Sequence, residues 1–226
     1  MDVDSLKRAA GEAAATLIED GMVVGLGTGS TAKFAVEAIG ARVQAGLKIL
    51  GIPTSEQTAA QARSLGIPLG ELTAERRVDL TIDGADEVDL HNLDLIKGRG
   101  GALLREKIVA SVSDRFVIVV DESKLVERLG RSVLPVEVVP FGWEATAHKL
   151  RELGAIPTLR KSGGGQAFVS EGGHYIVDCT LDGKLSTVAL GMELDGVVGV
   201  VEHGLFLGMT SRVFAASADG VRELTR

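Results

Sequence analysis

The chain has 226 residues, 45% hydrophobic and 24% charged, which is the composition of a globular protein with one large domain or a domain carrying a smaller insertion. Its formal net charge of −7, from 31 acidic and 24 basic residues, argues against a general nucleic-acid binder, which needs a basic face to neutralise phosphates. A small anionic substrate stays possible, because a few backbone N–H groups and lysines can outweigh the global charge locally.

The compartment is indicated by the N-terminus, the hydropathy and the cysteine content. Residues 1–4 (MDVD) lack the basic start and the apolar stretch of a signal peptide, and no run of 18 apolar residues predicts a membrane span. The single cysteine, Cys179, excludes an internal disulfide and is expected to be a small buried hydrophobe rather than a nucleophile. We therefore expect a cytoplasmic protein without a membrane partner.

Helices and strands alternate over the first 120 residues. Alanines and leucines at helical spacing predict a first helix from a cap at Asp4 or Ser5 to about Glu19. The next predicted elements are a strand at 22–26, a helix from Ser30 or Thr31 to 44, a strand at 47–52, a helix at 55–65, a strand at 78–82, a helix at 102–113 and a strand at 116–120. This alternation predicts a mostly parallel sheet, which binds ligands at the carboxyl ends of its strands.

A different pattern begins near Gly130. It comprises a proline-bracketed strand at 134–140, a helix at 142–153, strand-like stretches at 156–159, 167–169 and 175–180, and a flexible loop at 162–165. This order predicts a small inserted α+β unit. Late strands at 197–201 and 212–216 could return to the first sheet.

A glycine-rich loop, GLGTGST at 25–31, joins the first strand to the next helix. Glycines let backbone N–H groups approach an anion, and the helix N-terminus adds partial positive charge. The loop has Ser30 in place of the third glycine of a dinucleotide site, and it lacks the lysine of a P-loop. We expect it to recognise phosphate or carboxylate; a tight turn without a ligand is the alternative.

An acidic turn, DGADEVD at 83–89, directly follows the strand at 78–82. Its four acids resemble a divalent-metal site, but the calcium-loop spacing is not met and only His91 lies nearby. No metal is therefore predicted. Asp83 and Asp86 suit hydrogen bonds to sugar hydroxyls or proton transfer, and a solvated acidic turn is the alternative.

Two further turns carry cations. KGRGG at 97–101 opens the helix that contains Glu106, and DESK at 121–124 follows the strand at 116–120. The Glu106 side chain should lean back toward the glycine loop, although its spacing also fits a plain surface glutamate. Lys124 lies at the same predicted sheet edge, and by itself it is typical of a solvated lysine.

All these turns follow parallel strands, so we expect them to converge on one face. They bring together carboxylates, lysines and amides that can bind phosphate, and no serine nucleophile elbow is present. This set suits proton abstraction next to a carbonyl, with a lysine stabilising the enediolate.

Five segments together resemble ribose-5-phosphate isomerase, type A. They are GLGTGST (25–31), DGADEVD (83–89), KGRGGALLREK (97–107), DESK (121–124) and LPVEVVPFGW (134–143). They occur in that family's order and spacing, VVEHGLF at 200–206 looks like its closing strand region, and the resemblance covers nearly the whole chain.

The resemblance implies an aldose–ketose isomerase that interconverts D-ribose 5-phosphate and D-ribulose 5-phosphate in the non-oxidative pentose phosphate pathway, without metal or cofactor. Glu106 would move the proton between C1 and C2 through a cis-enediolate. Asp83 and Asp86 would handle hydroxyl protons and ring opening, and Lys97 would stabilise negative charge. The implied substrate-binding residues are Thr28, Gly29, Ser30, Thr31, Asp83, Gly84, Ala85, Asp86, Lys97, Gly98, Arg99, Gly100 and Lys124.

The resemblance also implies an α/β architecture. A Rossmann-like, mostly parallel sheet domain (1–130 plus 204–226) would carry a smaller ferredoxin-like α+β domain (131–203), and the chain would form homodimers or homotetramers. Arg99 departs from the family, in which many members have glycine there; its backbone N–H should still donate.

A glutamate with an ordinary pKa of about 4.3 is a weak base for a carbon-bound proton. We therefore expect bound substrate to desolvate Glu106 and raise its pKa, and Lys97 to limit that rise.

Two other classes of function fit parts of the pattern. One is a non-catalytic sugar-phosphate sensor, but no helix-turn-helix segment is predicted to carry its signal to DNA. The other is a different enzyme on a similar scaffold, either an amino-sugar-phosphate deaminase or a CoA transferase, the latter needing a covalent glutamate.

Overall fold

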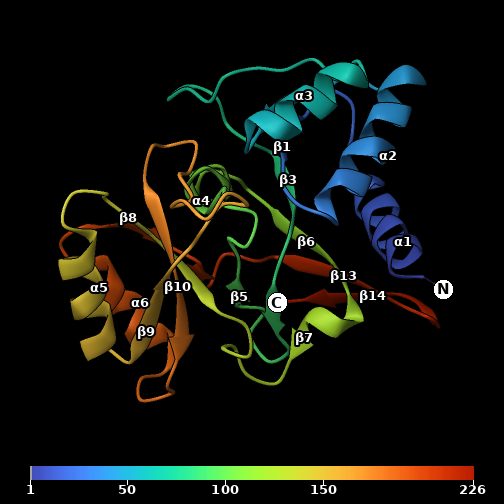
Figure 1. Ribbon diagram of the computed structural model, residues 1–226. Helices are drawn as coiled ribbons and strands as arrows, with labels where there is room; N and C mark the ends of the chain where they lie inside the picture. Colours follow the sequence, from blue (N-terminus) through green and yellow to red (C-terminus); the bar gives the residue numbers. More distant parts are fainter. Residues whose placement is uncertain (1) are drawn as a thin grey trace.

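The structure is a computed structural model that describes residues 2–226. Met1, with which the first predicted domain begins, lies outside the described residues. The described chain folds into three sheets covered by helices, and Figure 1 shows the smallest sheet between the other two.

The largest sheet has six strands and is mostly parallel, as predicted. In sheet order its strands are β14 (Gly220–Thr225), β13 (Arg212–Ser217), β6 (Phe116–Asp121), β3 (Leu80–Gly84), β1 (Val23–Leu26) and β2 (Leu50–Pro53). Only the β13–β14 pair is antiparallel. The chain runs from β1 to β2 on one side and then crosses back to β3 on the other side, so the strand order reverses at β1. Sheets of this kind bind ligands in the crevice at such a reversal, here between the carboxyl ends of β1 and β3.

Helices cover both faces of this sheet. They are α1 (Val3–Ala15), α2 (Ala32–Gln44), α3 (Glu56–Ser64) and α4 (Leu103–Ser111), and a 3₁₀ turn, η1, spans Glu122–Lys124. Alternate residues of β6 serve the two faces: Val117 and Val119 join the core under α1 and α2, whereas Ile118 and Val120 join the core on the opposite face. β6 is therefore an apolar run that is buried on both sides, as central parallel strands are.

The second sheet belongs to a βαββαβ unit. Its elements are β8 (Leu134–Val138), α5 (Trp143–Glu152), β9 (Ala155–Leu159), β10 (Tyr175–Leu181), α6 (Thr187–Asp195) and β11 (Val200–His203). The four strands pair antiparallel in the order β11-β8-β10-β9, which makes the unit ferredoxin-like. Both helices pack on one face, where Cys179 is buried as predicted.

A third, small sheet connects these two units. It contains β12 (Leu205–Phe206), β5 (Leu95–Ile96), β4 (Glu87–Asp89) and β7 (Leu125–Val126) in that order. Val88, Leu95 and Phe206 pack against the face of the large sheet opposite α1. The short strands thus hold the acidic turn and the approach to Lys97 against the large sheet.

Several predicted elements need correction. Asp2, rather than Asp4 or Ser5, caps α1, because its Oδ1 accepts from Ser5 N at 2.9 Å, and the helix ends at Ala15. The stretch predicted at 197–201 forms β11, which pairs with β8 and does not return to the large sheet. Residues 167–169 contribute only isolated bridges. Within residues 2–226, no helix is both long and apolar enough to span a bilayer.

Candidate active site

The turns that the sequence singles out surround one cavity of about 290 Å³ at the carboxyl ends of the parallel strands. The first loop follows β1, Asp83 and Gly84 end β3, the glycine loop follows β5, and Lys124 follows β6. The lining residues are Thr28, Gly29, Ser30, Thr31, Gly84, Ala85, Asp86, Lys97, Gly98, Arg99, Gly100, Glu106 and Lys124. Of the predicted site residues only Asp83 is not in the lining, because it is fully buried against Lys97.

Lys97, Asp83 and Glu106 form a buried cluster of charges. The Lys97 Nζ lies 3.0 Å from Asp83 Oδ2 and 3.4 Å from Glu106 Oε2, and it donates to Gly84 O at 2.6 Å. The Lys97 and Glu106 residues are only 2% and 4% exposed. In residues 2–226, Glu106 Oε2 makes no hydrogen bond, and its contact with Lys97 is an ion pair. Glu106 lies in the first turn of α4 and borders the cavity.

Burial perturbs the acidity of all three groups. Burial and then the negative charge of Asp83 raise the pKa of Glu106 to about 8, against the opposing effect of Lys97. Burial likewise raises the pKa of Asp83. Burial lowers the pKa of Lys97, but attraction to Asp83 and Glu106 outweighs this and the pKa is raised. The expectation that substrate must desolvate Glu106 therefore needs correction, because the protein alone buries the carboxyl group.

The loop after β1 is fastened to Asp83. Asp83 Oδ1 accepts from Thr28 N at 3.1 Å and from Gly84 N at 2.7 Å. Gly27 is required here, since a Cβ on it would lie 2.3 Å from Asp83 Oδ1. Thr31 is the N-cap of α2, but its side chain makes no capping bond. Its hydroxyl and the helix N-terminus are therefore suited to an anion.

A group of hydroxyls that the sequence analysis missed supports the same loop. Thr28 Oγ1 lies 2.7 Å from both Thr54 Oγ1 and Ser55 Oγ, and 3.1 Å from Thr58 Oγ1. Thr54 and Thr58 in turn donate to the carbonyls of Leu26 and Gly27. The only signal in the sequence was Ser55, at the start of a predicted helix.

The glycine loop of residues 98–101 needs its glycines at both ends. Gly98 and Gly101 have φ of 108° and 84°, in the region that favours glycine. A Cβ on Gly98 would also lie 2.9 Å from the Leu103 side chain. The Arg99 N–H donates to Asp86 Oδ2 at 3.0 Å, and the expectation that it donates to substrate stays a prediction. This bond holds the Asp86 carboxylate beside the loop.

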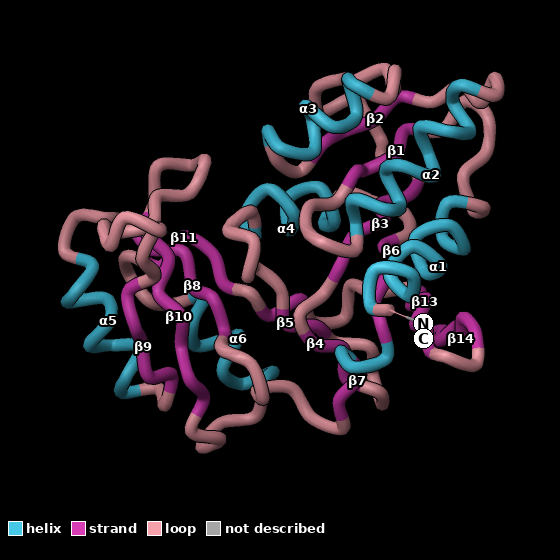
Figure 2. The backbone as a smooth tube through the Cα atoms, turned by 45° about the vertical axis from the view of Figure 1, so that its right-hand side comes forward, coloured by secondary structure: helices cyan, strands magenta, loops and turns pink. Residues whose placement is uncertain are grey.

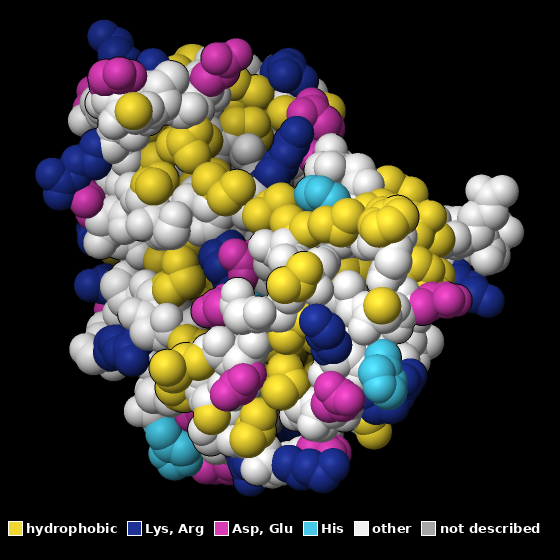
Figure 3. Space-filling view, turned by 90° about the vertical axis from the view of Figure 1, so that its left-hand side faces the viewer, with side chains coloured by type: hydrophobic (Ala, Val, Ile, Leu, Met, Phe, Trp, Pro, Cys, Tyr) yellow, Lys and Arg dark blue, Asp and Glu magenta, His cyan; other side chains and the backbone are white. Residues whose placement is uncertain are grey.

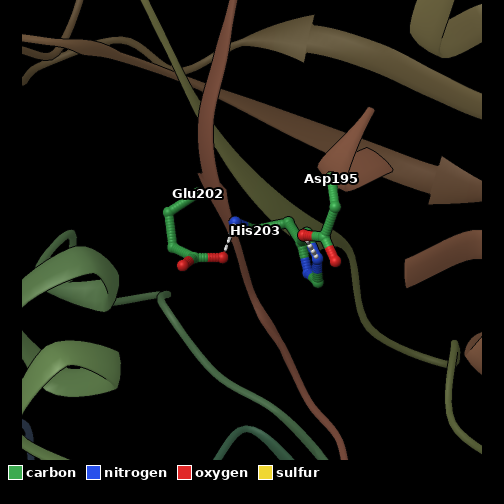
Figure 4. A group of neighbouring side chains, drawn as sticks. All are labelled: Asp195, Glu202 and His203. Carbon is green, nitrogen blue, oxygen red and sulfur yellow. Dashed lines mark hydrogen bonds and ion pairs between the residues drawn. The ribbon is translucent and has the colours of Figure 1, made fainter. Parts of the chain in front are cut away.

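A second group of side chains, two acids and a histidine, has the composition of a metal site, but its ligand atoms are already used in hydrogen bonds. Figure 4 shows Asp195, Glu202 and His203 close together. His203 Nδ1 accepts from Leu205 N at 3.2 Å, so its Nε2 carries the proton that faces Asp195 Oδ1 at 3.1 Å. Glu202 Oε1 also receives the Lys107 ammonium at 2.6 Å. Both ring nitrogens and one carboxylate are thus already used, and a cation there would face the Lys107 charge.

Comparison with known proteins gives one consistent result. The family model described as ribose 5-phosphate isomerase A (phosphoriboisomerase A) matches residues 50–220. A ribose-5-phosphate isomerase A from Gloeobacter violaceus is 58% identical over 226 residues, covering 100% of this chain and 98% of that protein.

Solved structures agree with this match. The ribose 5-phosphate isomerase from Plasmodium falciparum is 40% identical with a TM-score of 0.94, over 99% of both chains. A D-ribose-5-phosphate isomerase in complex with phospho-erythronic acid is 36% identical with a TM-score of 0.96, over 100% of both chains.

Proposed function

The chain belongs to the ribose 5-phosphate isomerase A family and is an aldose–ketose isomerase of ribose 5-phosphate, and we propose that Glu106 is the base of its reaction. The observation that carries this role is the buried Glu106 carboxyl at the cavity wall, which has a pKa of about 8 and pairs with Lys97 at 3.4 Å. A base works best with a pKa near the working pH, and a carboxylate with an ordinary pKa is too weak.

The proton transfer follows from this placement. The Glu106 carboxylate takes the proton from C2 of the open-chain aldehyde, and the electron pair moves to the C1 oxygen to give a cis-enediolate. The same carboxyl returns the proton to C1, and the proton of the C2 hydroxyl passes to the C1 oxygen, which gives the ketose with its C2 carbonyl and C1 hydroxyl. Glu106 thus ends each turnover in the state in which it began.

Lys97 stabilises the enediolate in this proposal. Its three N–H groups match the oxygens of Gly84, Asp83 and Glu106, at 2.6, 3.0 and 3.4 Å. The longest of these contacts is to Glu106, and it weakens when Glu106 accepts the substrate proton. The ammonium is then free to attract the oxyanion at the moment when that charge develops.

The two aspartates have different roles in the proposal. Asp86 borders the cavity, so we assign ring opening and hydroxyl proton transfer to it. Asp83 is fully buried against Lys97 and the Thr28 N–H, so we assign it the positioning of those two groups. This differs from the expectation that both carboxylates handle substrate protons.

The phosphate is expected beside the loop of residues 28–31, which we call the phosphate end of the cavity. Residues 28–31 precede α2, where backbone N–H groups and the helix N-terminus favour an anion, and Lys124 borders the same cavity. A structural neighbour carries phospho-erythronic acid, a short acid phosphate, which supports a sugar phosphate as the ligand.

The test is ketose formation from D-ribose 5-phosphate in the presence of EDTA, for wild type and Glu106→Gln. We expect wild-type turnover to survive EDTA and kcat to fall at least ~10²-fold in the variant, since a general base contributes that much. Glu12→Gln, exposed on α1, is the matched control and should keep wild-type kcat. An unchanged kcat in Glu106→Gln removes Glu106 from the mechanism. Binding without turnover by folded wild type would instead favour the sugar-phosphate sensor.

Assembly and location belong to the same proposal. We propose a cytoplasmic homodimer or homotetramer. Support for assembly comes from exposed apolar side chains in the ferredoxin-like unit, where Phe141, Met192 and Val198 are 93%, 73% and 81% exposed. Figure 3 shows hydrophobic side chains gathered on this side of the molecule. Sedimentation equilibrium measures the mass directly, and a monomer at micromolar concentration would contradict the assembly.

A further inference from the structure

Arg160, which directly follows β9, reaches from the ferredoxin-like unit to the glycine loop of the active site. Its Nη1 donates to Gly98 O at 3.0 Å and to Arg99 O at 3.1 Å. Its side chain is only 13% exposed. One guanidinium nitrogen thus fixes two successive carbonyls of a loop that borders the cavity.

The opposite edge of the Arg160 guanidinium is held by Asp178. Nε donates to Asp178 Oδ2 at 2.9 Å, and Nη2 pairs with Oδ1. Asp178 lies on β10, which pairs with β9 along its length. A planar fork held on a carboxylate in this way has little rotational freedom. The sheet of the ferredoxin-like unit therefore sets the position of Arg160.

The segment between β9 and β10 contacts the glycine loop and its surroundings at two more places. The Phe168 ring occupies the space beside Gly101, where a Cβ would lie 2.6 Å from the ring. Glu171 pairs with Arg105 of α4 at 2.7 Å and accepts from Glu56 N at 2.9 Å. Figure 1 shows this segment beside α4. Arg160 is the contact that reaches the backbone of the loop itself.

Backbone geometry transmits the contact to the cavity. In a trans peptide the C=O and N–H point in opposite directions, so fixing one fixes the other. Fixing Gly98 O therefore directs the Arg99 N–H, which donates to Asp86 Oδ2 at 3.0 Å. Fixing Arg99 O directs the Gly100 N–H, and Gly100 borders the cavity. In residues 2–226 that N–H has no acceptor, so a substrate oxygen can take it.

We propose that Arg160, held by Asp178, is a positioning residue of the isomerase, which aims the Gly100 N–H and the Asp86 carboxylate at the sugar end of the substrate. This rests on the proposed function. The phosphate end, formed by residues 28–31, has no contact with Arg160 and should not depend on it.

The test uses two variants. Arg160→Lys keeps the positive charge but loses the planar guanidinium, and Asp178→Asn keeps the side-chain shape but loses the charged partner that holds the guanidinium in place. Two competitive inhibitors report on the two ends of the site: 4-phospho-erythronate occupies both ends, and inorganic phosphate occupies one. We expect kcat/KM for D-ribose 5-phosphate to fall about 10- to 100-fold in Arg160→Lys, because misplacing a catalytic group by about 1 Å costs this much. Asp178→Asn should show a smaller loss in the same direction.

The inhibition constant for 4-phospho-erythronate should rise by a similar factor, while that for inorganic phosphate changes less than about twofold, since only the sugar end depends on the aimed loop. Arg151→Lys, exposed on α5 in the same unit, is the control and should match wild type. Wild-type kcat/KM in both test variants would overturn the role of Arg160. An equal rise in the inhibition constants of both inhibitors would also overturn the role of Arg160, because a generally loosened fold would weaken the binding of both. If wild type itself does not turn over, the proposed function fails and this inference with it.

Discussion

Glu106 is subject to opposing influences. An ammonium group 3.4 Å away and the N-terminal turn of α4 both favour its ionised form. Burial and the charge of Asp83 favour the protonated form, and they prevail, with a pKa of about 8 as the result. A base in this range is partly ionised at neutral pH and is strong enough to remove a carbon-bound proton once the substrate is oriented.

This acidity predicts the pH dependence of the reaction. Because Glu106 must be ionised to act, kcat/KM should rise about tenfold per pH unit below pH 8 and level off above it. Asp83 and Lys97 interact with Glu106, so the apparent pKa belongs to the group of three. Initial rates between pH 5.5 and 9.5 measure the profile. A profile that is already level at pH 6 would contradict the raised pKa.

The same shift predicts a cost in stability. The folded chain keeps the Glu106 proton up to about pH 8, whereas the unfolded chain releases it near pH 4.5, so the free energy of unfolding falls as pH rises through this window. Glu106→Gln has no proton to release, so its free energy of unfolding should not fall in this way. The variant should therefore become more stable relative to wild type by up to about 1 kcal/mol for each pH unit between pH 5 and 8. Urea unfolding at pH 5 and pH 7.5 measures the difference. A constant difference between the two proteins would refute the linkage.

Most residues that border the cavity could be predicted because glycines and acids at the carboxyl ends of parallel strands meet at one sheet edge. The expectation that the loop 97–101 also follows a parallel strand was wrong, because it follows β5, which pairs antiparallel with β4 and β12. The burial of Asp83 could not, since a sequence does not say which of two aspartates in a turn faces a ligand. Arg160 was also missed. It stands beside Lys161 in a polar stretch, and its two partners in the glycine loop lie 61 and 62 residues away along the chain.

At the scale of elements, the sequence predicted the buried strands best. The run 116–120 is apolar throughout and became β6 with almost the same bounds. The helix α6 was missed because its apolar residues form no clear stripe and Gly191 interrupts it. The two-residue strands β5, β7 and β12 are too short for a period, and they form only because the chain on either side brings them together.

The contact between α1 and α2 predicts an effect on stability without an effect on catalysis. Gly11 lies in the middle of α1, and a Cβ there would lie 2.6 Å from Ala35 N of α2. Alanine favours an isolated helix by about 1 kcal/mol over glycine, but overpacking against backbone costs about 1–3 kcal/mol. We expect Gly11→Ala to lower the free energy of unfolding by about 1 kcal/mol and to leave kcat unchanged.

Urea unfolding and the isomerase assay measure the two quantities for Gly11→Ala. Glu12→Ala, exposed on the same helix, controls for the change in helix propensity and should lose no comparable stability. A gain in stability on Gly11→Ala would mean that the two helices separate at little cost.

At the scale of the whole molecule, the sheet of the ferredoxin-like unit and the small connecting sheet meet at Gly204. Its carbonyl accepts from Lys97 N at 2.9 Å, and its N–H donates to Pro135 O of β8 at 2.8 Å. Gly204 also joins β11 of the ferredoxin-like unit to β12 of the connecting sheet. Figure 2 shows β4 and β5 between the two larger units. The main chain of the central lysine is therefore bonded directly to the junction. The predicted domain boundary at 203–204 coincides with this residue and stays a prediction.

Gly204→Ala should consequently lower stability and activity together. A Cβ would lie 2.2 Å from Lys97 O and 3.1 Å from the Pro135 ring, and neither can move without displacing a strand. We expect a loss of about 1–3 kcal/mol in the free energy of unfolding, the usual cost of overpacking. We also expect kcat to fall at least about tenfold, because the shift passes along the backbone to the Lys97 ammonium.

Urea unfolding and kcat for D-ribose 5-phosphate measure the two effects of Gly204→Ala. Gly196→Ala, at the end of α6, is the matched control: its Cβ would meet only Glu193 O, at an ordinary 3.5 Å. Loss of stability with wild-type kcat would show that Lys97 is held by Asp83 and Gly84 alone. Loss of both would show that the ferredoxin-like unit positions the catalytic lysine through one peptide group, which links the packing of the whole molecule to the chemistry of the site.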